Sequence, residues 1–171
     1  MWPFSKKHRF PGVKLHTDGT IDFTLTNEEA DAADRALHAF KDTLVHPEVA
    51  EKVRNGTMAV ALCHYARTLI EMHCAGLTET QYKKNWSIIQ KTLEKAVAAV
   101  WKSYNLCPLP IFLYHRACFL NMLGLKNESR KLYTAFLRRY AEYRMDQVDK
   151  SLIEYEGTDT EYALSHAREE A

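Results

Sequence analysis

One continuous stretch of the chain, between Leu109 and Ala141, constrains the fold more than any other. Its apolar residues recur every three or four positions on both sides of a single glycine, Gly124. That spacing puts them on one face of a helix before the glycine and on one face of a second helix after it. Because glycine readily adopts the left-handed conformation that ends helices, the stretch predicts two helices folded back on each other, with Asn127 as cap of the second. The two apolar faces comprise Phe112, Leu113, Ala117, Leu120 and Leu123, then Leu132, Ala135, Phe136, Leu137 and Tyr140.

Cap and stop signals divide the preceding part of the chain into further helices. A capping box at residues 26–29 predicts a helix that ends just before Pro47. Pro47 itself opens a short helix, which Asn55 and Gly56 are expected to close. A third helix is predicted over residues 57–75.

A longer helix is predicted over residues 80–104, where a heptad-like apolar seam suits antiparallel packing. Its aromatic residues are interpreted as core rather than as a ligand cage. After the hairpin, the second helix is predicted to extend to Glu156 with Gly157 as its cap, and a last short helix covers residues 161–170. The seam and its aromatic neighbours are Tyr82, Trp86, Ile89, Leu93, Ala96, Val97, Val100, Trp101 and Tyr104.

The one convincing β segment lies near the start of the chain, at residues 13–25. A three-residue loop at residues 17–19 puts the apolar side chains of both strands on one side, with Gly19 where that loop type needs a left-handed residue. A lone hairpin is marginal in water, so we expect its apolar face to pack on the helices. We therefore predict an N-terminal arm with a β-hairpin at residues 1–26 and one helical domain at residues 27–171.

Composition narrows the classes of protein to which the chain could belong. Its 171 residues, 46% of them apolar, suit one soluble domain, and the formal net charge of +1 gives no reason to expect nucleic acid or an anionic membrane as partner. No apolar run approaches the ~18–20 residues of a membrane span. The four cysteines contain no CxxC pair and follow no apolar signal segment. We therefore expect free thiols and a cytoplasmic location.

The hairpin stretch resembles a tetratricopeptide-type repeat, a helix–turn–helix unit of about 34 residues. With Gly124 at the turn, the small and large positions of that unit fall on Ala117, Leu120, Ser129 and Tyr133. The chain departs from the family at Leu113, where an aromatic anchor is usual, at Phe136, where a small residue is usual, and at Ala141, where a proline closes the unit. One unit, at residues 109–141, carries the resemblance.

The resemblance implies stacked helix pairs whose first helices line a concave groove for a partner. On that basis the partner-binding residues would be Tyr114, Cys118, Asn121 and Met122. The same four residues would be ordinary core or surface positions if the helices close into a bundle, and the apolar stripes are compatible with either arrangement.

No reactive constellation accompanies this architecture. Cys63, His64, His73 and Cys74 lie on one predicted helix, but the two histidines point about 180° apart and the two cysteines lie about 16 Å apart along its axis. A zinc site would therefore need a ligand from elsewhere, such as His115 or His38. No catalytic motif or phosphate-binding loop is present in the sequence, so we expect no enzymatic activity, no cofactor and no metal.

The second helix of the hairpin and its continuation are basic. These cations could contact phosphates, but Glu128 and Glu142 dilute them, and long arginine stems often cover apolar surface. Nucleic acid is therefore not the favoured partner. The cations are Arg130, Lys131, Arg138, Arg139 and Arg144.

The sequence thus predicts an all-α protein of antiparallel helix hairpins, six or seven helices in all, with an N-terminal β-hairpin arm. The favoured function is a non-enzymatic scaffold that binds a protein or peptide in a groove between helix pairs. Two alternatives stay open: a closed bundle that holds a small ligand or metal, and a homo-oligomeric subunit that uses a long helix at residues 127–156 as its interface.

Overall fold

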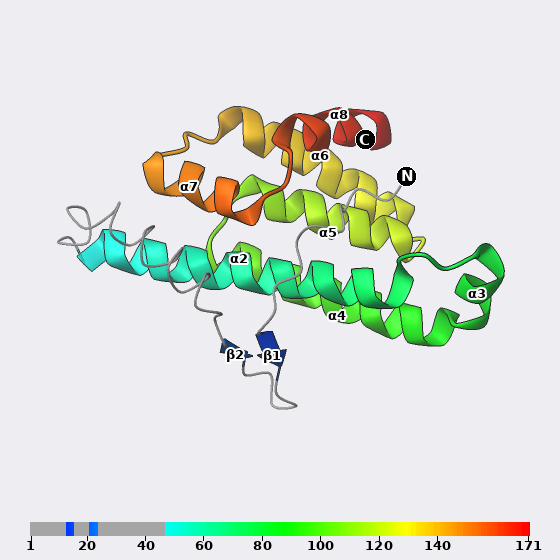
Figure 1. Cartoon of the computed structure of the whole chain (residues 1–171). Helices are drawn as coiled ribbons and strands as arrows, with labels where there is room; N and C mark the ends of the chain where they lie inside the picture. Colours follow the sequence, from blue (N-terminus) through cyan, green and yellow to red (C-terminus); the bar gives the residue numbers. More distant parts are fainter. Residues whose placement is uncertain (1–12, 16–20, 24–46) are drawn as a thin grey trace. The chain divides into compact units, whose positions relative to one another are not determined.

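The computed structural model describes residues 13–15, 21–23 and 47–171, and the chain divides into two units, Met1–Val53 and Arg54–Ala171, each considered by itself. Within residues 47–171 every regular element is a helix, which confirms the all-α class for that part (Figure 1). None of the described helices combines the length and apolar character needed to cross a bilayer. The helices are α2 (Pro47–Cys74), α3 (Glu79–Lys84), α4 (Trp86–Leu106), α5 (Pro110–Met122), α6 (Lys126–Glu142), α7 (Gln147–Glu156) and α8 (Thr160–Glu170).

Two short strands are described near the start of the chain, β1 (Val13–Leu15) and β2 (Ile21–Phe23). They pair antiparallel, with Val13 opposite Phe23 and Leu15 opposite Ile21. The rest of the predicted arm and the helix predicted after residue 26 lie outside the described residues. The arm and the domain boundary at residue 26 therefore stay predictions.

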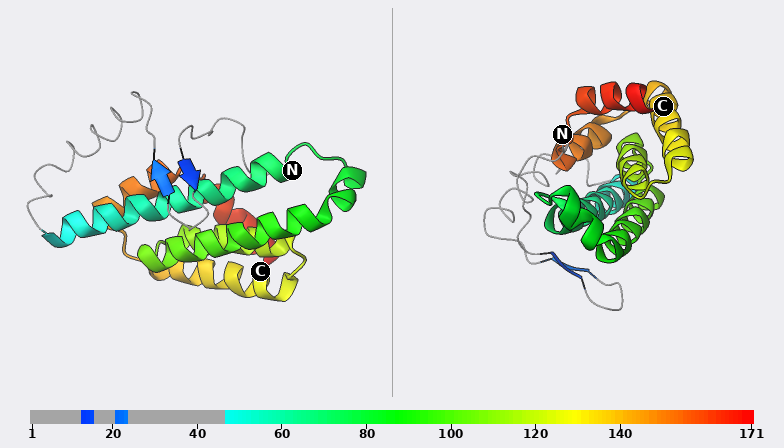
Figure 2. Two further views of the ribbon diagram at one scale, coloured as in Figure 1. Left: turned by 90° about the horizontal axis from the view of Figure 1, so that it is seen from below. Right: turned by 90° about the vertical axis from the view of Figure 1, so that its right-hand side faces the viewer.

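The α5–α6 hairpin is the centre of the second unit, and α4 packs alongside α5 (Figure 2). Gly124 joins the two helices with a positive φ of 79°, which confirms the predicted turn. The predicted Asn127 cap is wrong, because α6 already begins after Leu125 and has no side-chain cap. Helix α5 is buried nearly all round, beyond the single apolar face that its residue spacing predicts, because it lies between α4 and α6. Within the hairpin, the buried Ser129 hydroxyl donates a 2.8 Å hydrogen bond to the Ala117 carbonyl oxygen. Two small residues thus allow the helices to approach closely.

The predicted break at Asn55 and Gly56 is wrong, because α2 runs without interruption for 28 residues. Gly56 is buried, and a β-carbon at this position would collide with the Leu152 side chain of α7. The glycine therefore serves a close helix–helix contact rather than a helix end. Sequence spacing could not distinguish these roles, since the contact joins residues far apart in the chain.

Two of the predicted long helices are each divided in the structure. The helix expected over residues 80–104 breaks at Asn85, whose φ of −97° and ψ of 11° interrupt the ladder between α3 and α4. The helix expected over residues 127–156 breaks between Glu142 and Gln147. There Asp146 and Asp149 form a capping box that starts α7 afresh. The interface helix of the homo-oligomer alternative is therefore not continuous.

The predictions for the C-terminal turns are confirmed. Gly157 closes α7 in the left-handed conformation, with φ of 80°, and α8 covers the residues expected for the last short helix. Asp159 caps α8 by accepting a 3.1 Å hydrogen bond from the Tyr162 backbone N–H. Only the short segment 157–159 separates the two helices.

The interpretation of the α3–α4 aromatics as core is wrong for the two tryptophans. Trp86 is 36% exposed and Trp101 is 40% exposed, whereas the apolar centre of the seam is buried as predicted, at Ile89, Leu93 and Val100. The tryptophans flank that seam rather than lie within it. At least one of them is therefore placed to form part of a surface site.

Candidate functional site

The residues predicted to bind a partner lie on the face of α5 that meets α8. Tyr114 and Cys118 are buried, whereas Asn121 and Met122 are partly exposed. The Tyr114 hydroxyl lies 3.1 Å from His166 Nδ1, and Asn121 Nδ2 donates a 3.4 Å hydrogen bond to a carboxylate oxygen of α8. In this structure α8 of the same chain thus contacts the face of α5 that the sequence predicts to bind a partner.

A second cluster surrounds the carboxylate of Glu156, at the end of α7 and inside the helical core. Arg67 Nη1 of α2 donates a 2.6 Å hydrogen bond to Glu156 Oε1, and His115 Nε2 of α5 lies 2.9 Å from the same oxygen. The other oxygen, Oε2, accepts a 3.0 Å hydrogen bond from the Thr158 backbone N–H. The carboxylate and imidazole are fully buried, and the Arg67 side chain is 13% exposed. One carboxylate therefore connects three helices and the link to α8.

The protonation states in this cluster follow from burial and from the neighbouring charges. Burial alone raises the pKa of Glu156, but His115, Arg67 and Thr158 more than offset this and hold the pKa well below its usual range. Burial lowers the pKa of His115, which keeps the imidazole neutral, and raises the pKa of the Cys63 thiol. The cluster is therefore an ionised carboxylate paired with one guanidinium, beside a neutral imidazole and a neutral thiol.

The same cluster is the nearest approach to a metal site among the described residues. The candidate ligand atoms of Cys63, His115 and Glu156 lie within 4.8 Å of one another. Two other helices thus place possible metal ligands beside Cys63. However, Arg67 already supplies a positive charge 2.6 Å from the carboxylate oxygen. A divalent cation beside that guanidinium would be repelled in a medium of low dielectric constant. The arrangement suits an internal ion pair better than a metal centre.

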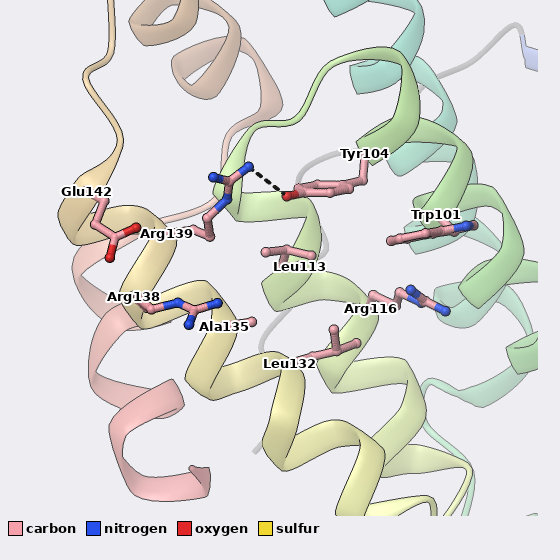
Figure 3. Close-up of a pocket in the computed structure, with 9 residues that line it drawn as sticks. All are labelled: Trp101, Tyr104, Leu113, Arg116, Leu132, Ala135, Arg138, Arg139 and Glu142. Carbon is pink, nitrogen blue, oxygen red and sulfur yellow. Dashed lines mark hydrogen bonds between the residues drawn. The ribbon is translucent and has the colours of Figure 1, made fainter.

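An open cavity lies on a different face of the hairpin, between α4, α5 and α6 (Figure 3). Its volume is about 440 Å³, and its floor consists of Leu113, Leu132 and Ala135. Arginines from α5 and α6 stand around this apolar floor, whereas Trp101 and Tyr104 line it from α4. The full lining is Trp101, Tyr104, Leu113, Arg116, Leu132, Ala135, Arg138, Arg139 and Glu142.

The aromatic residues of α4 position two of these arginines. The Arg116 guanidinium lies 4.2 Å from the ring centroid of Trp101, a cation–π contact. Arg139 Nη2 donates a 3.4 Å hydrogen bond to the Tyr104 hydroxyl. The Trp101 and Tyr104 rings stack on each other, with centroids 5.7 Å apart. The arginines are therefore held by neutral aromatic groups, which orient their charge without neutralising it.

A second cavity of about 360 Å³ adjoins the first along α6. Arg138 and Ala135 line both cavities, and Arg130, Lys131 and Thr134 complete the second. We call the two cavities together the arginine groove. Four arginines and one lysine line it, against the single carboxylate of Glu142.

The sequence shows the basic residues of α6 and the aromatic residues of α4, but it does not show that they lie side by side. The basic residues of α6 indicate a possible anion-binding face, whereas the apolar seam around Trp101 predicts a core position for that ring. Their association depends on how α4 packs beside the hairpin, which helical periodicity does not specify. A tryptophan near the end of an amphipathic helix is too weak a signal to reveal it.

In comparisons with known proteins, no family model, curated protein or solved structure matches this chain.

Proposed function

We propose that the helical unit is a non-enzymatic protein-interaction module and that its binding site is the arginine groove. The observation that carries the proposal is the combination of an open apolar floor with a rim of five cations and one acid. A partner of complementary chemistry is a peptide segment that alternates apolar side chains with aspartate or glutamate. Apolar side chains would pack on Leu132 and Ala135, and carboxylates would meet the arginines.

The length of the groove suits a short segment of extended chain. From Arg130 to Glu142, the first and last groove residues of α6, the rise along the helix is about 18 Å, at 1.5 Å per residue. An extended peptide covers that distance with about five residues, at 3.3 Å each. We therefore expect recognition of a short acidic motif rather than of a large folded surface.

The aromatic residues favour a protein partner over single-stranded nucleic acid. Proteins that bind single strands offer aromatic faces on which bases stack. Here the Arg116 guanidinium lies over the Trp101 ring and Tyr104 stacks beside it, so contacts within the protein already use this platform. The charge of the groove remains available, whereas the Arg116 guanidinium already lies over the Trp101 ring.

Fluorescence anisotropy tests this proposal with a labelled peptide in which leucines alternate with aspartate and glutamate. We expect saturable binding to the full chain, and no binding of a matched peptide that carries lysines in place of the acids. The double substitution Arg138→Glu and Arg139→Glu should weaken binding by about tenfold or more, which corresponds to about 1.4 kcal/mol.

The matched control is Arg144→Glu, which changes an exposed arginine just beyond the groove. It should leave the affinity within about twofold, because the charge lies outside both cavities. Circular dichroism would verify that all variants retain their helix content. Equal loss of affinity in the control and the groove variant would reduce the interaction to general charge attraction and overturn the proposed site.

A further inference from the structure

We propose that the acidic motif bound by the arginine groove carries a phosphorylated serine and that Arg138 and Arg139 bind its phosphate. This inference rests on the proposed function and specifies the ligand of the same site. It starts from the charge of the larger cavity, whose lining contains three arginines, Arg116, Arg138 and Arg139, and one carboxylate, that of Glu142. Three positive charges against one negative leave a net charge of +2.

A phosphate monoester matches that charge better than a carboxylate does. At neutral pH it carries about −1.5 to −2 and offers three strong acceptor oxygens. A carboxylate carries a single negative charge, offers two oxygens and forms its best contact with a single guanidinium. One carboxylate in this cavity would leave positive charge uncompensated beside an apolar floor, whereas one phosphate would neutralise it.

The hydrogen-bond donors needed for a phosphate are present. Among the described residues the Arg138 side chain makes no hydrogen bond or ion pair, and Arg139 is engaged by the neutral Tyr104 hydroxyl. Each guanidinium has five N–H donors arranged as a planar fork. The Arg116 Nε–H is buried over Trp101 without a hydrogen-bond partner in the described part of the chain, so this arginine contributes its charge and its terminal nitrogens.

The position of Arg138 fixes where the phosphate would lie in the motif. Arg138 lines both cavities, so a segment that follows α6 passes it on the way from one to the other. Arg130 and Lys131 in the second cavity would then meet acidic residues of the same segment. The expected ligand is a phosphoserine with an apolar neighbour on the Leu113 and Leu132 side and acidic residues on the Lys131 side.

The test compares three labelled peptides that differ at one central position, which holds serine, glutamate or phosphoserine. All three keep the same flanking leucines and acids, and binding to the full chain is followed by fluorescence anisotropy. We expect the phosphoserine peptide to bind about tenfold more tightly than the glutamate peptide, a difference of about 1.4 kcal/mol. The serine peptide should bind most weakly.

The second arm replaces Arg138 and Arg139 together by lysine. Lysine keeps the charge but lacks the planar fork, so the preference for phosphoserine over glutamate should fall to about twofold or less. Binding of the glutamate peptide should change little. This conservative pair separates phosphate recognition by guanidinium groups from attraction by positive charge.

The outcomes distinguish the inference from the function on which it rests. Equal affinity for the phosphoserine and glutamate peptides would overturn the inference and leave the acidic-peptide function standing. Failure of all three peptides to bind would overturn both. Tighter binding of a single-stranded oligonucleotide than of the phosphoserine peptide, lost in the Arg138→Glu and Arg139→Glu variant, would show that phosphates of nucleic acid are the ligand and would also overturn the inference.

Discussion

Arg67 and Arg138 place the same guanidinium group in two opposite settings. Arg67 lies at 13% exposure against the buried Glu156 carboxylate, 2.6 Å away, and donates a further hydrogen bond to the Glu156 carbonyl oxygen. Arg138 stands exposed at the rim of the arginine groove and makes no ion pair to the described residues. Arg67 is paired with Glu156 inside the protein, whereas Arg138 is available to bind an acidic group of another molecule.

This contrast shows which charges hold the protein together and which are candidates for function. A buried ion pair contributes little net stability when intact but is strongly destabilising when one partner is removed. Exposed charges contribute little to stability in either state. The strongest interactions of the fold are therefore poor guides to its binding site, and the weakly engaged arginines are better ones.

The largest effect is expected from Glu156→Ala, which removes the partner of Arg67 and of His115. An uncompensated guanidinium would remain in the core, and we expect the free energy of unfolding to fall by about 3–5 kcal/mol. Urea denaturation followed by circular dichroism measures the change. The control is Glu154→Ala, an exposed glutamate of the same helix. If Glu156→Ala lowered the free energy of unfolding by less than about 1 kcal/mol, the Glu156 cluster would not be what holds α7 against α2 and α5.

Lowering the pH should weaken the same region without any substitution. Burial lowers the pKa of His64 to about 4, whereas an unfolded histidine titrates near pH ~6.5, so the unfolded state binds more protons between these values. Stability from neutral His64 is complete above about pH 6.5 and is lost as the pH falls towards 4, by roughly 3 kcal/mol. The depressed pKa of Glu156 adds a further loss in the same direction below about pH 4.

Urea midpoints measured from about pH 7 to about pH 4 would test this dependence. His64→Gln removes one of two buried histidines whose pKa burial lowers, the other being His115, and should make the profile less steep. His73→Gln, at an exposed position of the same helix, should leave the profile unchanged. If the profile of His64→Gln were as steep as that of the unmodified protein, groups other than His64 would cause the pH dependence.

A smaller change in the free energy of unfolding is expected from Gly56→Ala, which tests whether apolar packing also holds α7 against α2. In Gly56→Ala the new methyl group meets the Leu152 side chain. Overpacking of this kind costs about 1–3 kcal/mol, and the better helix propensity of alanine returns about 1 kcal/mol, so we expect a net loss of about 1 kcal/mol. In a Leu152→Ala background the sign should reverse, because the collision is gone and the propensity gain remains. The same sign in both backgrounds would contradict the close contact.

The smallest effect is expected from Arg138→Ala. Its side chain is exposed and makes no ion pair to the described residues, so the urea midpoint should stay within experimental error of the unmodified protein. Arg67→Ala, measured alongside, should lower the midpoint clearly. Similar destabilisation by the two substitutions would erase the distinction between the core arginine and the groove arginine.

Local sequence patterns predict the features of this fold that depend on local chemistry. Glycine's access to positive φ predicts the turns at Gly124 and Gly157, and both residues have a positive φ. Gly56 escapes such a prediction because its role depends on Leu152, almost a hundred residues away. The start of α7 carries a usable signal, the spacing of Asp146 and Asp149, which the continuing apolar stripe obscures.

The two clusters of the structure are less accessible from the sequence. The Glu156 cluster joins α2, α5 and α7, and a glutamate before a glycine at a helix end gives no sign that it is buried. The arginine groove requires α4 to lie beside the hairpin. Both depend on tertiary packing, which apolar periodicity restricts without selecting among the possible neighbours.

The link between α7 and α8 also restricts any displacement of the C-terminal helix. The Thr158 backbone N–H bonds the same carboxylate that holds Arg67, and α8 begins two residues later. Swinging α8 away from Tyr114 therefore requires either rotation of the chain at Asp159 or rupture of the Glu156 cluster. In amide hydrogen exchange, the Thr158 amide should then be protected as long as the core of α7, while the outer turns of α8 exchange sooner.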